Sequence, residues 1–188
     1  MFQLVILDRD GVINQDSDDY IKSLAEWIPI PGSIEAIARL SKAGYRVVVA
    51  TNQSGIGRGL FDLDELEAMH ARLNELVHDQ GGELDGIFYC PHTPEDGCHC
   101  RKPAPGLLDA IAVEFGQSLC GVPLIGDSLR DLQAGLSHHC KLILVRTGKG
   151  ATTEAKLAAQ LETELQQAAV FDDLAQAVDS LLVNTGEL

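Results

Sequence analysis

The stretch QLVILDRDG (residues 3–11) runs from a short apolar segment directly into two carboxylates that stand two residues apart. Residues 3–7 are rich in branched aliphatic side chains, as expected of a strand that is buried on both faces of a sheet. Asp8 and Asp10 can face the same cleft if the chain stays extended beyond this strand. Such a pair can divide the chemistry, one carboxylate attacking as a nucleophile while the other moves a proton.

Further apolar runs and helical patterns follow along the chain. Strands are predicted over residues 45–50, 86–89, 122–125 and 142–145, and helices over 33–43, from Asp62 onward, over 105–115, over 129–136 and, as one or two closing helices, from Ala151. Strand and helix in alternation predict a Rossmann-like α/β fold, in which a parallel sheet has helices on both faces. Residues 1–188 are expected to form a single domain.

The composition fits one water-soluble domain. The chain has 188 residues, 45% of them hydrophobic, and a formal net charge of -14. So acidic a chain disfavours nucleic acid as a partner, because binding to phosphates requires a cationic face. No apolar run reaches the roughly 18 residues of a membrane span, and the N-terminus lacks a basic segment and a cleavage site. We therefore expect a cytoplasmic monomer with neither nucleic acid nor membrane among its partners.

Polar residues follow the predicted strands, at the edge of a parallel sheet where ligands bind. Asp127 would be a third carboxylate beside Asp8 and Asp10, and two such charges about 4 Å apart repel by roughly 4 kcal/mol at an effective dielectric constant near 20. A cation must offset them, and hard oxygen ligands favour Mg2+. With the cation of Lys102 and the hydrogen-bond donors at Thr51, these are the components of phosphoryl transfer.

Three of the five cysteines crowd into eleven residues together with a histidine. The pattern Cys-x-His-x5-Cys-x-Cys consists of Cys90, His92, Cys98 and Cys100. Three sulfurs and one imidazole complete the tetrahedral set of a structural zinc ion, which would stabilise the loop that carries Arg101 and Lys102. The alternatives are free thiols or a redox pair, and His99 could replace a neighbouring ligand.

The remaining cysteines and histidines and the tryptophan are not expected to take part in the chemistry. Cys120 and Cys140 flank strands and are predicted to be small core residues. Trp27 is predicted to pack beneath a loop. Surface roles are predicted for His70, His78, His138 and His139.

Five segments of the chain resemble the four sequence motifs of the haloacid dehalogenase-like phosphatases. They are Asp8–Asn14, Thr51–Gly55, Cys90–His92, Cys100–Pro103 and Gly126–Asp131. Within that superfamily the chain most resembles the D-glycero-D-manno-heptose 1,7-bisphosphate 7-phosphatases, with the histidinol-phosphate phosphatases as close relatives. The resemblance implies a Mg2+-dependent phosphatase that removes the 7-phosphate of a phosphorylated sugar through an aspartyl-phosphate, in the synthesis of the heptose precursor of lipopolysaccharide core. Because loops, helices and strands fill the segments between the motifs, no large cap domain is expected.

The resemblance also implies a role for each residue of the centre. Asp8 would be the nucleophile, and Asp10 the general acid and base. Mg2+ would be held by the carboxylate of Asp8, the main-chain oxygen of Asp10 and Asp127. Thr51 and Lys102 would hold the transferring phosphoryl group.

Substrate contacts are expected from the loops around this centre. By resemblance they involve Asp16, Ser17, Asp18, Asp19, Tyr20, Asn52, Gln53, Ser54, Arg58 and Arg101. The loop of residues 16–20 departs from the family pattern, so it is open which of its acids meets a sugar hydroxyl and whether the loop is simply solvated. Asp131 is expected to act through a metal-bound water or by orienting Lys102, or else to stabilise the first turn of a helix.

Two other functions are open from the sequence alone. Hydrolysis of histidinol phosphate would use the same machinery. The alternative of another class is a zinc-stabilised binding module without catalysis, against which the joint presence of the catalytic set argues. That set consists of Asp8, Asp10, Thr51, Lys102 and Asp127. The sequence leaves the preferred anomer at C1 undecided.

Overall fold

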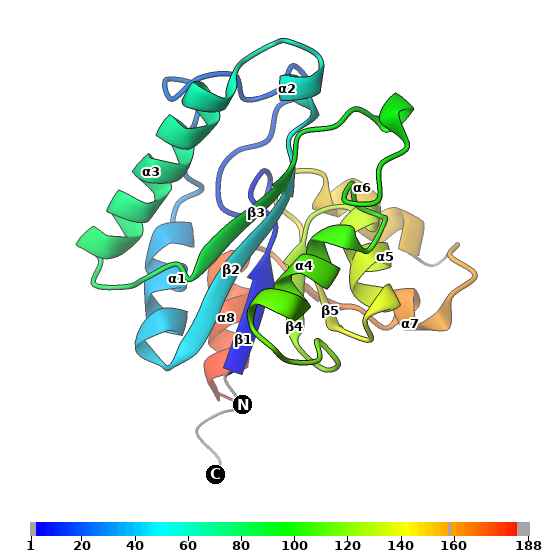
Figure 1. The fold of residues 1–188 in the computed structure, drawn as a ribbon. Coiled ribbons are helices and arrows are strands. Elements are labelled where there is room, and N and C mark those ends of the chain that lie inside the picture. Colours follow the sequence, from blue (N-terminus) through cyan, green and yellow to red (C-terminus); the bar gives the residue numbers. More distant parts are fainter. Residues whose placement is uncertain (1–2, 158, 184–188) are drawn as a thin grey trace.

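A computed structural model describes residues 3–157 and 159–183. Its elements, in chain order, are β1 (Gln3–Leu7), α1 (Ser33–Lys42), β2 (Tyr45–Asn52), α2 (Ser54–Gly57), α3 (Leu63–Asp79), β3 (Gly86–Cys90), the 3-10 helix η1 (Pro94–Asp96), α4 (Gly106–Glu114), β4 (Pro123–Gly126), α5 (Leu129–Ser137), β5 (Lys141–Val145), α6 (Gly150–Leu157), α7 (Thr163–Gln166), β6 (Ala169–Phe171) and α8 (Leu174–Val183). The alternation of strand and helix that the sequence predicts is present along most of this length (Figure 1).

The strands form one parallel sheet in the order β3-β2-β1-β4-β5-β6 (Figure 1). In β1, Val5 is in register with Val47 of β2, and Ile6 is in register with Leu124 of β4. The chain therefore winds outward from β1 in both directions, through β2 and β3 on one side and through β4, β5 and β6 on the other. The loops that follow β1 and β4 part at this switch point and leave a crevice at the carboxyl ends of the strands.

Helices cover both faces of the sheet, and each face has its own hydrophobic core. Val5 and Leu7 of β1 belong to the core that includes α1, α3 and α8, whereas Leu4 and Ile6 belong to the core that includes α4 and α5. All four side chains are at most 2% exposed. The Rossmann-like α/β fold is therefore confirmed, and within the described residues no cap domain interrupts it.

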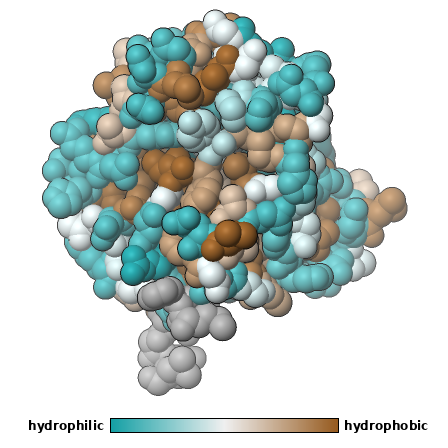
Figure 2. Space-filling view, viewed as in Figure 1, coloured by the Kyte–Doolittle hydropathy of each residue, from teal (hydrophilic) through white to brown (hydrophobic). Residues whose placement is uncertain are grey.

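The helix α3 begins where the sequence predicts it. The side chain of Asp62 accepts a hydrogen bond from the backbone N–H of Glu65 (3.0 Å), which caps the first turn. Leu66, Met69 and Leu73 are fully buried and recur at the three- and four-residue spacing of one helix face. In the space-filling view, hydrophilic residues cover most of the outer surface in the region of α3 (Figure 2).

The C-terminal part differs from the prediction of one or two closing helices. Beyond β5 the chain forms α6, α7, β6 and α8. The strand β6 has three residues, all only partly buried, and pairs with β5 at the edge of the sheet. So short a strand, like the single turn of α2, leaves no periodic pattern to recognise. Residues 184–188, which the closing helices were predicted to include, lie outside the described residues.

Most of the residues without a predicted chemical role are buried or exposed as the sequence predicts. Trp27 is 5% exposed and Cys140 is buried, whereas His78 and His139 are exposed. The prediction for Cys120 is wrong, because this residue is exposed. It lies in a turn that precedes β4, and turns run over the surface, where the backbone can bond to water.

The described part of the chain gives no sign of a membrane span. Within residues 3–157 and 159–183, no helix combines the length and the apolar character needed to cross a bilayer.

Two aliphatic residues of α4 provide a test of the core. Leu108 is fully buried, whereas Val113 is 82% exposed. Leu108→Ala should lower the free energy of unfolding by about 2–5 kcal/mol, because it removes buried contacts and leaves a cavity. Val113→Ala, the matched control, should change it by less than about 0.5 kcal/mol. Urea unfolding followed by circular dichroism measures both, and equal effects would contradict this assignment of the core.

Candidate active site

A buried lysine joins the loops at the carboxyl ends of the central strands. Lys102 is 3% exposed, and its Nζ lies 3.0 Å from Oδ1 of Asp8 and 2.5 Å from Oδ1 of Asp131. The same nitrogen donates a hydrogen bond to the carbonyl oxygen of Ala50 (2.6 Å). Burial lowers the pKa of Lys102, but the carboxylates of Asp131 and Asp8 outweigh burial and raise this pKa above its ordinary value. The side chain is therefore a fixed cation at the end of β1.

Asp131 is positioned by the helix that it caps. It lies in the first turn of α5, where its Oδ2 accepts hydrogen bonds from the hydroxyl (2.6 Å) and the N–H (3.0 Å) of Ser128. Burial alone would raise the pKa of Asp131, but Lys102 and Ser128 lower it. A Cβ at Gly126 would lie 2.3 Å from the Cβ of Asp131, so glycine is required there. Its contacts agree with two of the three roles predicted for this residue, orienting Lys102 and stabilising the first turn of the helix, and the role through a metal-bound water stays a prediction.

Two buried carboxylates and a partly buried one surround a space that suits a metal ion. Oxygens of Asp8, Asp127 and Asp131 lie within 4.8 Å of one another. Burial, followed by the charge of Asp131, raises the pKa of Asp127 to about 7, and the same two causes raise the pKa of Asp8 well above its ordinary value. The backbone N–H of Lys149 donates to Oδ2 of Asp127 (2.7 Å). A set of hard oxygen donors that is short of positive charge fits Mg2+.

The carboxylate of Asp10 lies in a network of side-chain donors. Arg9 donates through Nε to Oδ1 (3.0 Å) and through Nη2 to Oδ2 (3.1 Å). Asn14 donates to Oδ1 (2.8 Å), and the amide of Gln53 donates to Oδ2 (2.8 Å). Asp10 nevertheless lines the cavity that contains Asp8, with its side chain 21% exposed.

The end of β2 supplies two residues of the centre. Thr51 is 1% exposed, and its hydroxyl accepts a hydrogen bond from the side-chain amide of Gln53 (2.9 Å). The side chain of Asn52 bonds to both backbone groups of Lys102, donating to its carbonyl oxygen and accepting from its N–H (3.0 Å each). Asn52 therefore fixes the lysine segment, besides lining the cavity.

A cavity of about 740 Å³ contains this centre. Its lining brings together every predicted catalytic residue and nine of the ten predicted substrate contacts: Asp16, Ser17, Asp18, Tyr20, Asn52, Gln53, Ser54, Arg58 and Arg101. The exception is Asp19, which is exposed and does not line the cavity. Its N–H instead bonds to the hydroxyl of Ser17 (3.1 Å), within the loop itself.

Three cations of the lining are absent from the sequence-based prediction. They are Arg130, Lys149 and Lys156. Lys149 follows β5, so the rule that strand ends meet at one edge would have found it. Its Nζ lies 3.2 Å from a carboxylate oxygen of Asp16 and 3.4 Å from one of Asp18, which links the acidic loop to the segment that follows β5.

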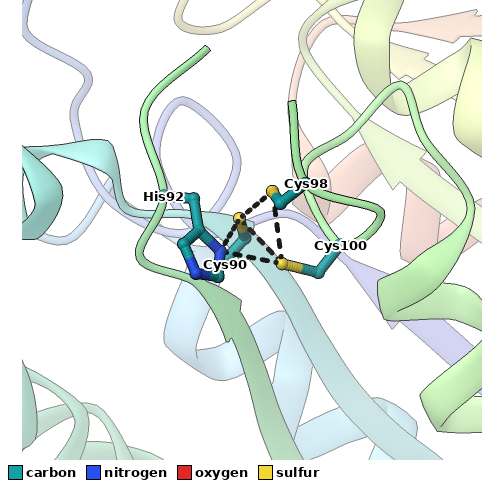
Figure 3. A group of neighbouring side chains, drawn as sticks. All are labelled: Cys90, His92, Cys98 and Cys100. Carbon is teal, nitrogen blue, oxygen red and sulfur yellow. Dashed lines mark hydrogen bonds between the residues drawn. The ribbon is translucent and has the colours of Figure 1, made fainter. Parts of the chain in front are cut away.

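The predicted zinc ligands form a compact cluster at the end of β3 (Figure 3). The Sγ of Cys90 lies 3.5 Å from that of Cys98 and 3.1 Å from that of Cys100, and Nδ1 of His92 lies 3.6 Å and 3.2 Å from the Sγ atoms of Cys90 and Cys100. A zinc ion with Zn–S bonds of about 2.3 Å separates its sulfur ligands by about 3.8 Å, close to these spacings. His99 is not part of the cluster, because its Nε2 pairs with Asp109 (2.8 Å).

The cluster of candidate zinc ligands leads directly into the segment that carries Arg101 and Lys102. Arg101, next to the last ligand, donates from Nη1 to the carbonyl oxygen of His92 (3.2 Å), and Lys102 follows. Four protein ligands leave no open position, so an ion held here has a structural role.

Known proteins share this arrangement along most of the chain. A family model described as polynucleotide kinase 3 phosphatase matches residues 3–124, and one described as HAD-hydrolase-like matches residues 99–177. The D-glycero-beta-D-manno-heptose-1,7-bisphosphate 7-phosphatase of Pseudomonas aeruginosa is 59% identical, over 95% of this chain and 97% of that protein. The protein of the same name from Pseudomonas putida is 57% identical, over 96% and 99%.

A solved structure agrees in fold as well as in sequence. It is the crystal structure of D,D-heptose 1,7-bisphosphate phosphatase from Bordetella bronchiseptica, complexed with magnesium and phosphate. Its TM-score is 0.91 and its sequence identity 50%, over 97% of this chain and 99% of that one. The resemblance predicted from the motifs is thereby confirmed. The chain belongs to the D-glycero-beta-D-manno-heptose-1,7-bisphosphate 7-phosphatase family, within the haloacid dehalogenase-like superfamily.

Proposed function

We propose that this protein removes the 7-phosphate of D-glycero-β-D-manno-heptose 1,7-bisphosphate, with Mg2+ and through an aspartyl-phosphate. The observation that carries the proposal is the buried ammonium of Lys102, 3.0 Å from the Asp8 carboxylate and in one cavity with Asp127. The substrate follows from the name of the relatives that are 57% and 59% identical. Residues 1–188 act as one phosphatase domain in this proposal.

In the first step, Asp8 attacks the phosphorus atom of the 7-phosphate. Its Oδ1 accepts hydrogen bonds from the N–H of Arg9 (2.7 Å) and lies 3.0 Å from Nζ of Lys102, which leaves Oδ2 to form the new bond. Thr51 and Lys102 bind the phosphoryl oxygens. The bond between phosphorus and O7 breaks as Asp10 gives its proton to O7, so the sugar leaves as a neutral alcohol.

In the second step, a water molecule releases the phosphate. Asp10, now ionised, accepts a proton from the water as its oxygen attacks the phosphorus atom. The bond between phosphorus and Oδ2 of Asp8 breaks. Inorganic phosphate leaves, and both aspartates return to their starting states.

Magnesium would be held by Asp8, Asp127 and the main-chain oxygen of Asp10. When bound, Mg2+ supplies positive charge that offsets the carboxylates and the anionic phosphate. The raised pKa values of Asp8 and Asp127, caused first by burial, are consistent with carboxylates that await a cation.

The cavity has room and charge for the remainder of a sugar bisphosphate. Its volume of about 740 Å³ lies within the range of about 300–1,000 Å³ usual for small-molecule sites. We assign sugar contacts to the loop of residues 16–20 and to residues 52–54. The cations of the lining are available to the phosphate at C1: Arg58, Arg101, Arg130, Lys149 and Lys156.

The cellular setting follows from the same family. We propose a cytoplasmic enzyme, acting as a monomer in the synthesis of the heptose precursor of lipopolysaccharide core. A formal net charge of -14 disfavours nucleic acid as the partner and leaves room for a small anionic substrate in a locally cationic site.

Replacement of the nucleophile tests the covalent mechanism. Asp8→Asn should reduce phosphate release more than about 1,000-fold, because the amide cannot form the aspartyl-phosphate. Asp64→Asn, on the exposed surface of α3, is the matched control and should keep the wild-type rate. Hydrolysis by Asp8→Asn at the wild-type rate would contradict the proposal.

A substrate comparison tests the assigned reaction. With Mg2+ present, phosphate release from the β-anomer of the heptose bisphosphate should exceed release from the α-anomer by about tenfold or more. Release from histidinol phosphate should be slower than from either. A strong preference for histidinol phosphate would assign the chain to the related reaction instead, and release by no substrate would favour the inactive binding module.

Metal analysis tests the zinc site. The purified protein should contain about one zinc ion per chain, and Cys98→Ser should remove most of it together with activity, since the cluster precedes Lys102. Cys120→Ser, which replaces an exposed cysteine outside the cluster, should retain both. A preparation free of zinc yet fully active would refute a structural zinc ion.

A further inference from the structure

The residue between the two catalytic aspartates is a buried arginine. Arg9 is fully buried, although arginine is rarely found without solvent contact. Within the described residues, Asp10 is the carboxylate that pairs with its guanidinium, at 2.9 Å. Removing a guanidinium from water costs several kcal/mol unless it is paired and hydrogen-bonded, so this placement needs a reason.

The geometry of the pair is a fork. Nε and Nη2 of Arg9 donate to the two separate oxygens of Asp10, at 3.0 Å and 3.1 Å. Two parallel bonds of this kind fix both the position and the plane of a carboxylate, which the point charge of a lysine cannot do. Asn14 and Gln53 each add one further donor, one to each oxygen.

Gln53 connects this network to the residue that holds phosphate. Its Oε1 accepts from Nη2 of Arg9 (3.1 Å), and its Nε2 donates both to Asp10 (2.8 Å) and to the hydroxyl of Thr51 (2.9 Å). The spacing between Asp10 and Thr51 is therefore set by one amide group whose own orientation depends on Arg9.

The guanidinium of Arg9 also contacts a histidine of α3 through its remaining nitrogen, Nη1. Nη1 of Arg9 lies 3.4 Å from Nε2 of His70, whose ring lies 5.9 Å from that of Tyr89. Burial, and then the charge of Arg9, lower the pKa of His70 to about 4, so a neutral imidazole accepts from the arginine. The prediction of a surface role for His70 is thus wrong, because its side chain is partly buried and accepts a hydrogen bond from Arg9.

We propose that Arg9 is a positioning residue, which holds the carboxylate of Asp10 where it can pass a proton to O7 of the substrate and later take one from water. The inference rests on the proposed function, in which Asp10 is the general acid and base. Arg9 does not contact the reacting atoms with its side chain; it acts through the orientation of Asp10.

The test compares leaving groups that differ in their need for a proton. A sugar alkoxide requires protonation as the bond to phosphorus breaks, whereas 4-nitrophenolate leaves without it. Arg9→Lys keeps the positive charge but removes the pair of parallel hydrogen bonds to the two oxygens of Asp10. It should slow release of heptose 1-phosphate in a single turnover by about 10- to 100-fold, part of the usual contribution of a general acid, while the nitrophenolate burst from 4-nitrophenyl phosphate falls by less than about threefold.

The controls separate this role from a structural one. Arg72→Lys, on the exposed face of α3, should leave both rates unchanged. A loss by Arg9→Lys that is equal for the two substrates, or no loss for either, would overturn the proposal. If Arg9→Lys does not fold, Asn14→Ala decides by the same criterion, because it removes a different donor to Asp10.

Asp10→Asn is measured in parallel to distinguish two failures. If Asp10→Asn slows both phosphoryl transfers equally, the general acid of the proposed function is misassigned. If Asp10→Asn discriminates between the substrates and Arg9→Lys does not, the proposed function stands and the role of Arg9 is refuted.

Discussion

The pairing of the Lys102 ammonium with two carboxylates is the interaction on which the site depends. A buried ammonium without such partners would cost several kcal/mol, so the fold must deliver Asp8 from β1 and Asp131 from α5 to the same nitrogen. Asp8, Asp127 and Asp131 together carry three negative charges when ionised, and Lys102 carries one positive charge, which leaves a net charge of two minus. A divalent cation balances this difference, which explains why the same centre needs both a fixed lysine and a metal ion.

The lysine is held from two neighbouring strands. Asn52 at the end of β2 bonds to both backbone groups of Lys102, and Cys90, in register with Asn52 at the end of β3, is one corner of the cluster that ends at Cys100. A zinc ion in that cluster would close the loop between them. The position of Lys102 is thereby set by the side chain of Asn52 on one side and, with zinc bound, would be fixed by the cluster on the other.

The sequence predicts what depends on strong local patterns. The apolar run of β1, the cap at Asp62 and the cysteine spacing each carry their signal within a few residues, and the structure confirms the fold built from them. The contact between Arg9 and His70 spans 61 positions, so no local pattern reports it. Lys149 lies four residues beyond β5, so it does not directly follow the strand as Asp8 and Asp127 do, although the rule that strand ends meet at one edge applies to it too. The exposure of Cys120 depends on where a turn meets the surface, which composition does not reveal.

Lys149 makes one contact with a buried carboxylate and two contacts through its exposed ammonium, and salt affects these contacts to different extents. Its backbone N–H bonds to the buried carboxylate of Asp127, while its exposed ammonium pairs with Asp16 and Asp18 of the acidic loop. Dissolved salt screens pairs at the surface far more than buried ones, with a Debye length of about 8 Å at physiological ionic strength. Rising ionic strength would therefore weaken the ion pairs of Lys149 with Asp16 and Asp18, while the backbone hydrogen bond to Asp127 is little affected. In the proposed function, a change in ionic strength would therefore affect the contacts of Lys149 with the acidic loop more than its backbone bond to Asp127.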